Sequence, residues 1–195
     1  MTTGPDIAVV RGRIAELART PLLAPDEERR AERMLPVAAA SFVAGRTLLR
    51  QLLGRWLERD PRPIRITDDP DAKPRLDRDD ADLDFNVAHA GDFVLVAVAR
   101  GRAIGVDVEH VSRRRRVTAI AEAALGPDAA YELRMLPLAR RAARFTCWWV
   151  RIEAVCKATG AGLTFPVDDS IPPGFTVRDV AMPAGYRAAV AWSAA

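Results

Sequence analysis

A short β-branched segment that carries two acidic residues restricts this chain more than any other stretch. Residues 104–109 read Ile-Gly-Val-Asp-Val-Glu. Because a strand sends residues i and i+2 to the same face, Asp107 and Glu109 point one way, roughly 7 Å apart, and the isoleucine and valines point the other way. Gly105 shares the carboxylate face and has no side chain, which leaves room for a ligand. The segment therefore predicts a strand with one apolar face and one acidic face.

Two like charges side by side on a strand cost free energy unless a cation or water relieves them. A hard cation such as Mg²⁺ is the first hypothesis for this face. The alternative is an ordinary strand with a solvated polar face, and the segment alone does not decide between them.

Composition limits the class of protein. The 195 residues are 49% hydrophobic and 28% charged, enough for one large domain or two small ones. No apolar run is long enough to span a membrane, and no secretory signal is visible, so a cytoplasmic protein is expected. Cys147 and Cys156 lie nine residues apart in one predicted helix and are not expected to pair. The net charge of +3 slightly favours anionic partners and is too small to indicate nucleic acid.

Hydrophobic periodicity predicts a mixed pattern of helices and strands. Charged residues after Pro25 predict a helix whose arginines are solvated. Longer helices are expected at residues 37–59, 117–125, 128–136 and 140–159, and strands at 63–67, 93–99, 103–109, 175–180 and 186–192. The run Phe93–Ala99 is apolar on both faces, so it predicts a central covered strand. His89 is placed in the loop before it, and Gly160 is placed to end the last long helix.

Two helices carry charges beside apolar side chains. Arg46 falls inside the apolar sector of its helix, and Arg50 falls nearer the edge. A buried partner carboxylate or a bound phosphate would each explain Arg46. Glu153 borders an apolar stripe with two tryptophans, and Lys157 follows one turn later. These two could form an exposed i,i+4 pair or face an interface between half-domains.

Five short blocks in a fixed order give a more specific signal. The chain resembles the Sfp-type 4′-phosphopantetheinyl transferases, which move phosphopantetheine from coenzyme A to a serine of a carrier protein. The blocks are Ala44–Arg50, Ala72–Leu76, Phe85–Gly91, Ile104–Glu109 and Trp149–Leu163. The resemblance implies an α+β fold that is a pseudo-dimer of two similar half-domains, with the active site in the cleft between them. The halves are expected at residues 1–101, with the phosphate contacts, and 102–195, with the metal ligands and the catalytic helix.

The resemblance also assigns roles by position. It implies Mg²⁺ held by Asp107, Glu109 and Glu153, with coenzyme A as co-substrate. Its catalytic residues would be Glu153, Lys157 and Asp107. Its coenzyme A contacts would be Arg46, Lys73, Asn86, Ala88, His89 and Lys157, with Arg46 and His89 at the 3′-phosphate. Glu153 would accept the proton of the carrier serine, and 3′,5′-ADP would leave.

Three positions depart from the family pattern. Ile152 stands where the family usually has lysine, and Ala88 stands where a serine often precedes the histidine. The segment Val37–Ser41 is uncharged where the family tends to be basic. These changes predict altered affinity for coenzyme A, with the metal ligands retained.

The expected partner is an apo acyl or peptidyl carrier protein of fatty acid, polyketide or non-ribosomal peptide biosynthesis, and the enzyme is expected to be a monomer. The basic run Arg113–Arg116 suits an acidic carrier, and a solvated basic face is the alternative. A non-catalytic module that binds coenzyme A or another nucleotide is the second hypothesis, favoured by Ile152 and Ala88. Retention of all three acidic positions favours the enzyme.

Overall fold

A computed structural model describes residues 2–4, 6–67, 73–77, 80–112, 117–162 and 171–194. The predictions for Ala72, Arg113–Arg116 and Leu163 lie outside these residues. The chain is α+β, as predicted. The helices are α1 (Ile14–Leu17), α2 (Pro25–Ala31), α3 (Pro36–Trp56), α4 (Val117–Leu125), α5 (Pro127–Met135) and α6 (Leu138–Thr159). The strands are β1 (Thr2–Gly4), β2 (Ile7–Arg13), β3 (Ile66–Thr67), β4 (Arg75–Leu76), β5 (Leu83–Ala90), β6 (Phe93–Arg100), β7 (Ile104–His110), β8 (Phe175–Asp179) and β9 (Tyr186–Ser193).

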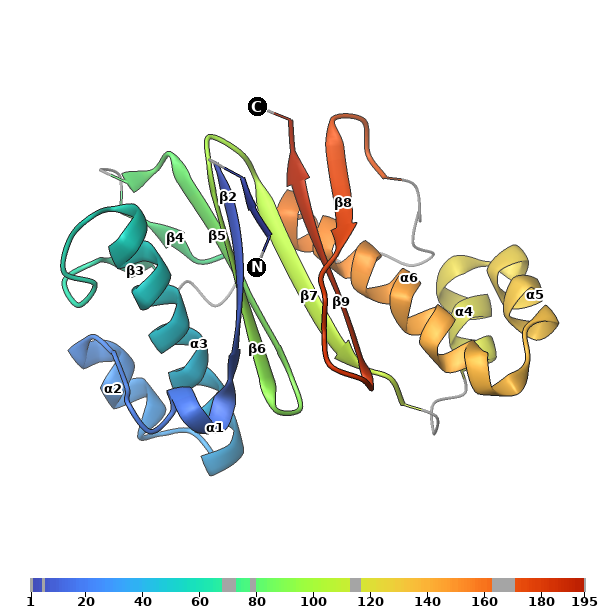
Figure 1. Ribbon diagram of the computed structural model, residues 1–195, viewed down its shortest axis with the longest axis horizontal. Helices are drawn as coiled ribbons and strands as arrows, with labels where there is room; N and C mark the ends of the chain where they lie inside the picture. Colours follow the sequence, from blue (N-terminus) through green and yellow to red (C-terminus); the bar gives the residue numbers. More distant parts are fainter. Residues whose placement is uncertain are drawn as a thin grey trace.

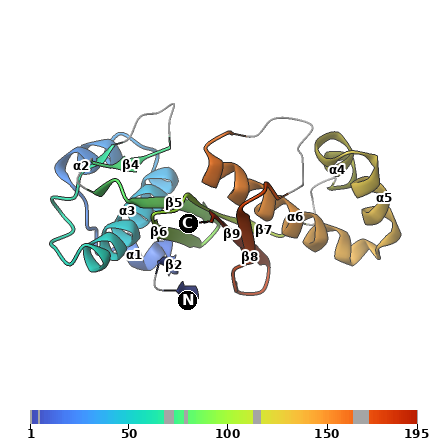
Figure 2. The ribbon, with the colours of Figure 1, turned by 90° about the horizontal axis from the view of Figure 1, so that it is seen from above.

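The strands form two main antiparallel sheets. One has the order β1-β2-β6-β5 and the other β7-β9-β8, and β3 and β4 form a separate short pair. Figures 1 and 2 show both sheets in the middle of the molecule, with α1–α3 on one flank and α4–α6 on the other. The chain passes from the first sheet to the second between Arg100 and Ile104, beside the predicted boundary. That the two halves are related copies stays a prediction.

Strand β6 is covered on both faces, as its apolar run predicted. Its even-numbered valines, Val94, Val96 and Val98, pack in the cluster that holds Leu49 and Leu53 of α3. The alternate side chains pack against the second sheet; these are Leu95, Ala97 and Ala99, which meet Ile104, Val106 and Val108 of β7. The apolar face of β7 is therefore an interface between the sheets, and its acidic face turns toward α6.

Gly105 has a different role from the one predicted. A Cβ on this residue would lie 2.1 Å from the Ala154 carbonyl oxygen and 2.4 Å from the Ala158 nitrogen. The backbone of α6 therefore fills the space that the sequence left for a ligand, and the glycine permits a close strand–helix crossing. At its end, α6 is capped by Gly160 in the left-handed conformation (φ 70°), as predicted.

Three other predictions need correction. His89 lies within β5, because β5 pairs with β6 along its whole length and only Gly91 and Asp92 form the turn. Arg50 is not at an edge: it is 1% exposed and donates to Glu27 and to the carbonyls of Pro61, Arg62 and Ile64. The strand predicted at 63–67 is confined to Ile66–Thr67.

Both cysteines are free thiols, as expected. Within the part of the chain that the structure describes, no helix has the length and apolar character needed to cross a bilayer.

Candidate functional site

The acidic face of β7 meets α6 in a buried polar cluster. Asp107 is 5% exposed, and the Lys157 Nζ donates to its Oδ1 at 2.6 Å. Among the described residues, the Asp107 Oδ2 is a buried oxygen with no hydrogen-bond partner. The crossing at Gly105 makes this cluster possible, because it brings the last turns of α6 against β7.

Electrostatics tie Glu109 and Glu153 to the same cluster. Burial raises the pKa of Asp107 to about 6, Lys157 opposes the rise, and Glu153 and Glu109 add to it. Burial also raises the pKa of Glu153, with Lys157 opposing and Glu109 adding. The three predicted acids and Lys157 therefore interact as one set of charges.

The donor chemistry of this set suits a hard cation. An unsatisfied carboxylate oxygen beside two further acids is the kind of site that Mg²⁺ relieves. Among the described residues, however, no three acidic, histidine or cysteine side chains converge as a ready metal site. Lys157 holds one oxygen of Asp107, so the orphaned Oδ2 is the atom that fits a metal best.

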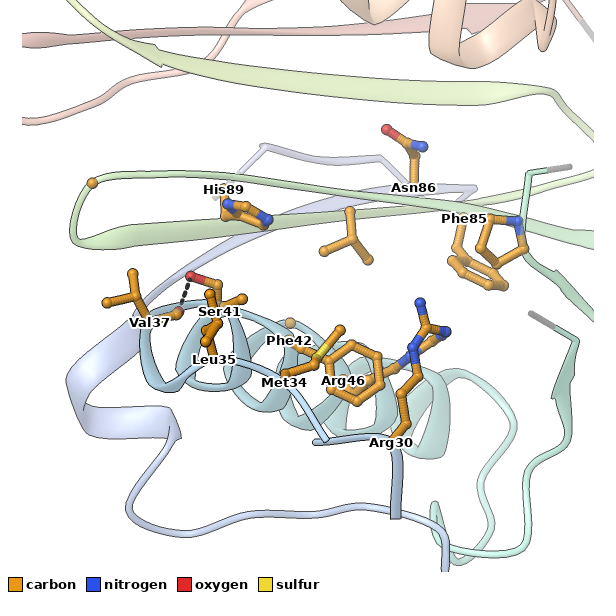
Figure 3. A pocket seen from close by; sticks show the side chains of 15 residues that line it. Arg30, Met34, Leu35, Val37, Ser41, Phe42, Arg46, Phe85, Asn86 and His89 are labelled. Carbon is orange, nitrogen blue, oxygen red and sulfur yellow. Dashed lines mark hydrogen bonds between the residues drawn. The ribbon is translucent and has the colours of Figure 1, made fainter. Parts of the chain in front are cut away.

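A cavity of about 730 Å³ lies between α2, α3 and β5 (Figure 3). Polar side chains at its wall are Arg30, Ser41, Arg46, Asn86 and His89, and the rest of its lining is largely apolar. In Figure 3, Arg30 and Arg46 lie toward one end, and His89 and Ser41 toward the other. The cavity thus offers cationic groups inside an apolar wall.

Arg46 is 8% exposed, and Glu27 is the buried partner carboxylate that was one of the two explanations for its position. Its Nε lies 3.5 Å from Oε1 of Glu27, whose other oxygen accepts from Arg50 at 2.7 Å. Glu27 was not predicted to be buried. Arg46 nevertheless also lines the cavity, so the partner carboxylate and a bound anion are compatible.

Arg30 is a site candidate that sequence reasoning missed, because it was read as part of a solvated face. Its guanidinium lies 5.0 Å from the centre of the Phe42 ring, and that of Arg46 lies 5.5 Å from the same ring. Arg30 is also close enough to lower the pKa of Arg46, although burial is the larger cause of that shift. The sequence held no usable signal for Arg30, because the face of α2 that it shares with Glu27, three residues earlier, is marked only by the burial of Glu27, which was not predicted.

Asn86 connects the wall of the cavity to β7, the strand that carries Asp107. It lines the cavity, and its Oδ1 accepts from the backbone N–H of Val106 at 3.0 Å. Figure 3 shows its side chain directed from β5 toward the neighbouring β7. Since Val106 precedes Asp107, the predicted phosphate contacts at Arg46 and His89 and the predicted metal ligands lie on adjoining elements.

Lys73 and Ala88 lie elsewhere. The Lys73 Nζ donates to Asp84 Oδ2 at 2.5 Å and to the Ile104 carbonyl at 2.7 Å, and the residue lines a second cavity of about 480 Å³. Ala88 is buried in the apolar cluster between the sheets, and Ile152 is also buried. The predicted contacts of Lys73 and Ala88 with coenzyme A stay predictions.

Comparison with known families covers both halves of the chain. A model of the 4′-phosphopantetheinyl transferase superfamily matches residues 103–186, and one of the 4′-phosphopantetheinyl transferase N-terminal region matches residues 16–101. These matches confirm the family that the five blocks predicted.

Individual relatives agree with the family models. The 4′-phosphopantetheinyl transferase HetI from Nostoc sp. is 33% identical over 183 residues, 92% of this chain and 74% of HetI. The Synechocystis sp. protein slr0495 is 33% identical over 153 residues, 77% of this chain and 62% of its own length. A holo-(acyl-carrier-protein) synthase from Bacillus anthracis str. Ames superposes with a TM-score of 0.43 and 17% identity, over 49% of this chain and 94% of that one. A TM-score this low supports no conclusion about the site.

Proposed function

Because the chain belongs to the 4′-phosphopantetheinyl transferase superfamily, we propose that it transfers phosphopantetheine from coenzyme A to a serine of an apo acyl or peptidyl carrier protein. The observation that carries the proposal is the link between two charged sites: Asn86, at the wall of the cavity with Arg30, Arg46 and His89, bonds the strand that carries Asp107 of the buried cluster. Coenzyme A carries a 3′-phosphate and a pyrophosphate, and the two sites can each bind one of these groups.

The cavity binds the 3′-phosphate end of coenzyme A in this proposal. An arginine guanidinium matches a phosphate with two parallel N–H groups, and a cavity wall that excludes water strengthens the attraction. Glu27 offsets part of the cost of burying Arg46 before the ligand arrives. His89 and Ser41, toward the other end of the cavity, supply further polar contacts.

The acidic cluster binds the pyrophosphate, through a cation, and activates the incoming serine. Mg²⁺ held by Asp107 with Glu109 and Glu153 would neutralise the pyrophosphate oxygens. Lys157 stabilises negative charge that develops on the phosphoryl oxygens. Glu153 accepts the proton of the serine hydroxyl as the new O–P bond forms, and the P–O bond of the pyrophosphate breaks with its electron pair leaving on 3′,5′-ADP. The raised pKa of Glu153 suits a proton acceptor.

Arg46→Ala is expected to weaken coenzyme A binding about 10- to 100-fold, the usual value of a charged hydrogen bond. Titration calorimetry measures the dissociation constants of coenzyme A and of 3′-dephospho-coenzyme A. The loss should be confined to coenzyme A, because the variant removes a contact to the 3′-phosphate. Arg29→Ala, at an exposed position of the neighbouring helix and outside the cavity wall, is the matched control. Equal losses for both ligands would contradict the 3′-phosphate role.

Glu153→Gln is expected to lower kcat about 100-fold and to leave the dissociation constant of 3′,5′-ADP unchanged, because it removes a proton acceptor and keeps the shape of the side chain. Steady-state transfer kinetics with an apo carrier protein measure kcat. A wild-type rate in this variant would show that Glu153 is not the proton acceptor.

A further inference from the structure

Side chains join the two sheets where β5 runs beside β7. The strands belong to different sheets and share no backbone ladder. Instead, Asp84 and Asn86, two residues apart on one face of β5, accept from backbone N–H groups of β7. The Asp84 Oδ2 accepts from Ile104 at 2.7 Å, and the Asn86 Oδ1 accepts from Val106 at 3.0 Å. These bonds pair two N–H groups on the edge of β7 that β9 does not cover.

Lys73 completes this junction. Its Nζ donates both to Asp84 and to the carbonyl of Ile104, so Asp84 of β5 holds the N–H of Ile104 and Lys73, just before β4, holds its C=O. The Lys73 side chain is only 15% exposed, and burial lowers its pKa although the hydrogen bond to Asp84 opposes the effect. This partly buried amine is held by two protein acceptors and is not available to a ligand, because its release would leave Asp84 without its countercharge.

Lys73 itself does not line the phosphate cavity, although its neighbour Pro74 does. It lines the second cavity, together with Arg75, Arg102 and the end of α6, and does not line the cavity of Arg46 and His89. The strand that it holds carries Asp107 three residues after Ile104. Any slip of β7 along β5 would therefore move Asp107 relative to the cavity.

We propose that Lys73 is a positioning residue: with Asp84 and Asn86 it fixes β7 against β5, and so sets the separation between the 3′-phosphate cavity and the Asp107 cluster. This role is an alternative to the coenzyme A contact that the family resemblance implies for Lys73, and its catalytic consequence rests on the proposed function. Binding of 3′,5′-ADP to the cavity does not need the junction, whereas transfer needs both sites in register.

The first test does not depend on activity. Amide hydrogen exchange, followed by NMR, should be about 10-fold faster or more at Ile104 in Lys73→Met and in Asp84→Ala than in the wild type, because Asp84 accepts from this N–H and Lys73 holds both Asp84 and the Ile104 carbonyl. The double variant should exchange no faster than the faster single variant, since both remove one linked contact. Arg75→Met, at an exposed neighbour that lines the same cavity, is the matched control and should leave Ile104 unchanged.

The second test separates positioning from phosphate contact. In Lys73→Met and in Asp84→Ala, the dissociation constant of 3′,5′-ADP should stay within about 2-fold of the wild-type value, while kcat falls about 10-fold or more. Lys73→Arg, which keeps the charge and the reach, should recover most of kcat. If Lys73→Met weakens 3′,5′-ADP binding about 10-fold while Asp84→Ala does not, Lys73 is a phosphate contact and the proposal is wrong.

The remaining outcomes are also decisive. Should Lys73→Met fail to fold, Asp84→Ala and Lys73→Arg carry the same two measurements. If the wild-type protein transfers nothing but the Ile104 amide responds as expected, the proposed function fails and the junction stands. If the amide of Ile104 does not respond to either variant, the junction is wrong whatever the activity.

Discussion

Asp107→Asn is expected to lower transfer by about 1000-fold or more and, at neutral pH, to make the protein more stable. On the proposed function, the activity falls because this carboxylate, with its orphaned oxygen, would bind the cation at the pyrophosphate, and a neutral amide would replace it poorly. The stability rises because burial makes the charged form of Asp107 costly. A gain in stability with a loss of activity is typical of a residue retained for function.

The sign of the stability effect follows from proton linkage. The pKa of Asp107 is about 6 in the folded protein, against an ordinary value of 3.8, so the folded state binds this proton more tightly than the unfolded state. The free energy of unfolding therefore falls as the pH rises from about 4 to about 6, by up to about 3 kcal/mol, and stays lower above that range. Asparagine removes the free-energy cost of the buried charge. The ammonium group of Lys157 loses its ion pair with Asp107, but its side chain is 31% exposed, so water can solvate it and the loss is small.

Thermal unfolding of the metal-free protein at about pH 7.5 and about pH 4 measures the effect. We expect the melting temperature of Asp107→Asn to exceed that of the wild type at the higher pH, and the difference to shrink at the lower pH, where folded wild-type protein holds the Asp107 proton. Glu16→Gln, at an exposed position on α1, is the control for loss of a charge. Equal shifts at both pH values would contradict a buried, charged Asp107.

Gly105→Ala is expected to destabilise the protein by about 3 kcal/mol or more. The new methyl group would overlap the Ala154 carbonyl oxygen and the Ala158 nitrogen, which are backbone atoms of α6 and cannot rotate away as a side chain could. Helix α6 must then move away from β7, and Glu153 and Lys157 move with it. Urea denaturation measures the loss of stability, and the transfer assay should show a lower kcat under conditions where the variant is folded.

Gly101→Ala is the matched control for this variant. Gly101 has φ +63°, but a Cβ added there would have nothing within 4 Å, so alanine should cost only about 1 kcal/mol of backbone strain. If Gly105→Ala were as stable as Gly101→Ala, the close crossing of β7 and α6 would be wrong.

Sequence patterns correctly predicted those helices and strands that a regular repeat of apolar residues, or a neighbouring glycine, defines. The two-faced apolar run of β6, the opposite faces of β7 and the glycine cap of α6 are confirmed, because each depends on neighbouring residues and on a regular repeat. His89 was misplaced by a short distance: it was expected in the loop before β6, although Gly91 and Asp92 alone are enough to turn the chain.

Tertiary contacts account for what the sequence could not predict. Gly105 looked like space for a ligand, and only the crossing of α6 shows that the space is occupied. Arg50 looked peripheral on its own helix, and its burial depends on Glu27 and on the carbonyls of a segment that follows α3. The partners of Lys73 in the structure, Asp84 and the Ile104 carbonyl, could not be predicted either, because the chain brings them to it from two different strands.

Transfer to an apo carrier protein tests the central claim most directly. The protein is incubated with coenzyme A, Mg²⁺ and the carrier, and intact-protein mass spectrometry then measures the mass of the carrier. We predict that the carrier gains one phosphopantetheine group, that EDTA prevents the gain, and that a carrier with alanine in place of its acceptor serine stays unmodified. Tight binding of coenzyme A with no modification of any apo carrier protein would contradict the account and would leave a coenzyme A-binding module in its place.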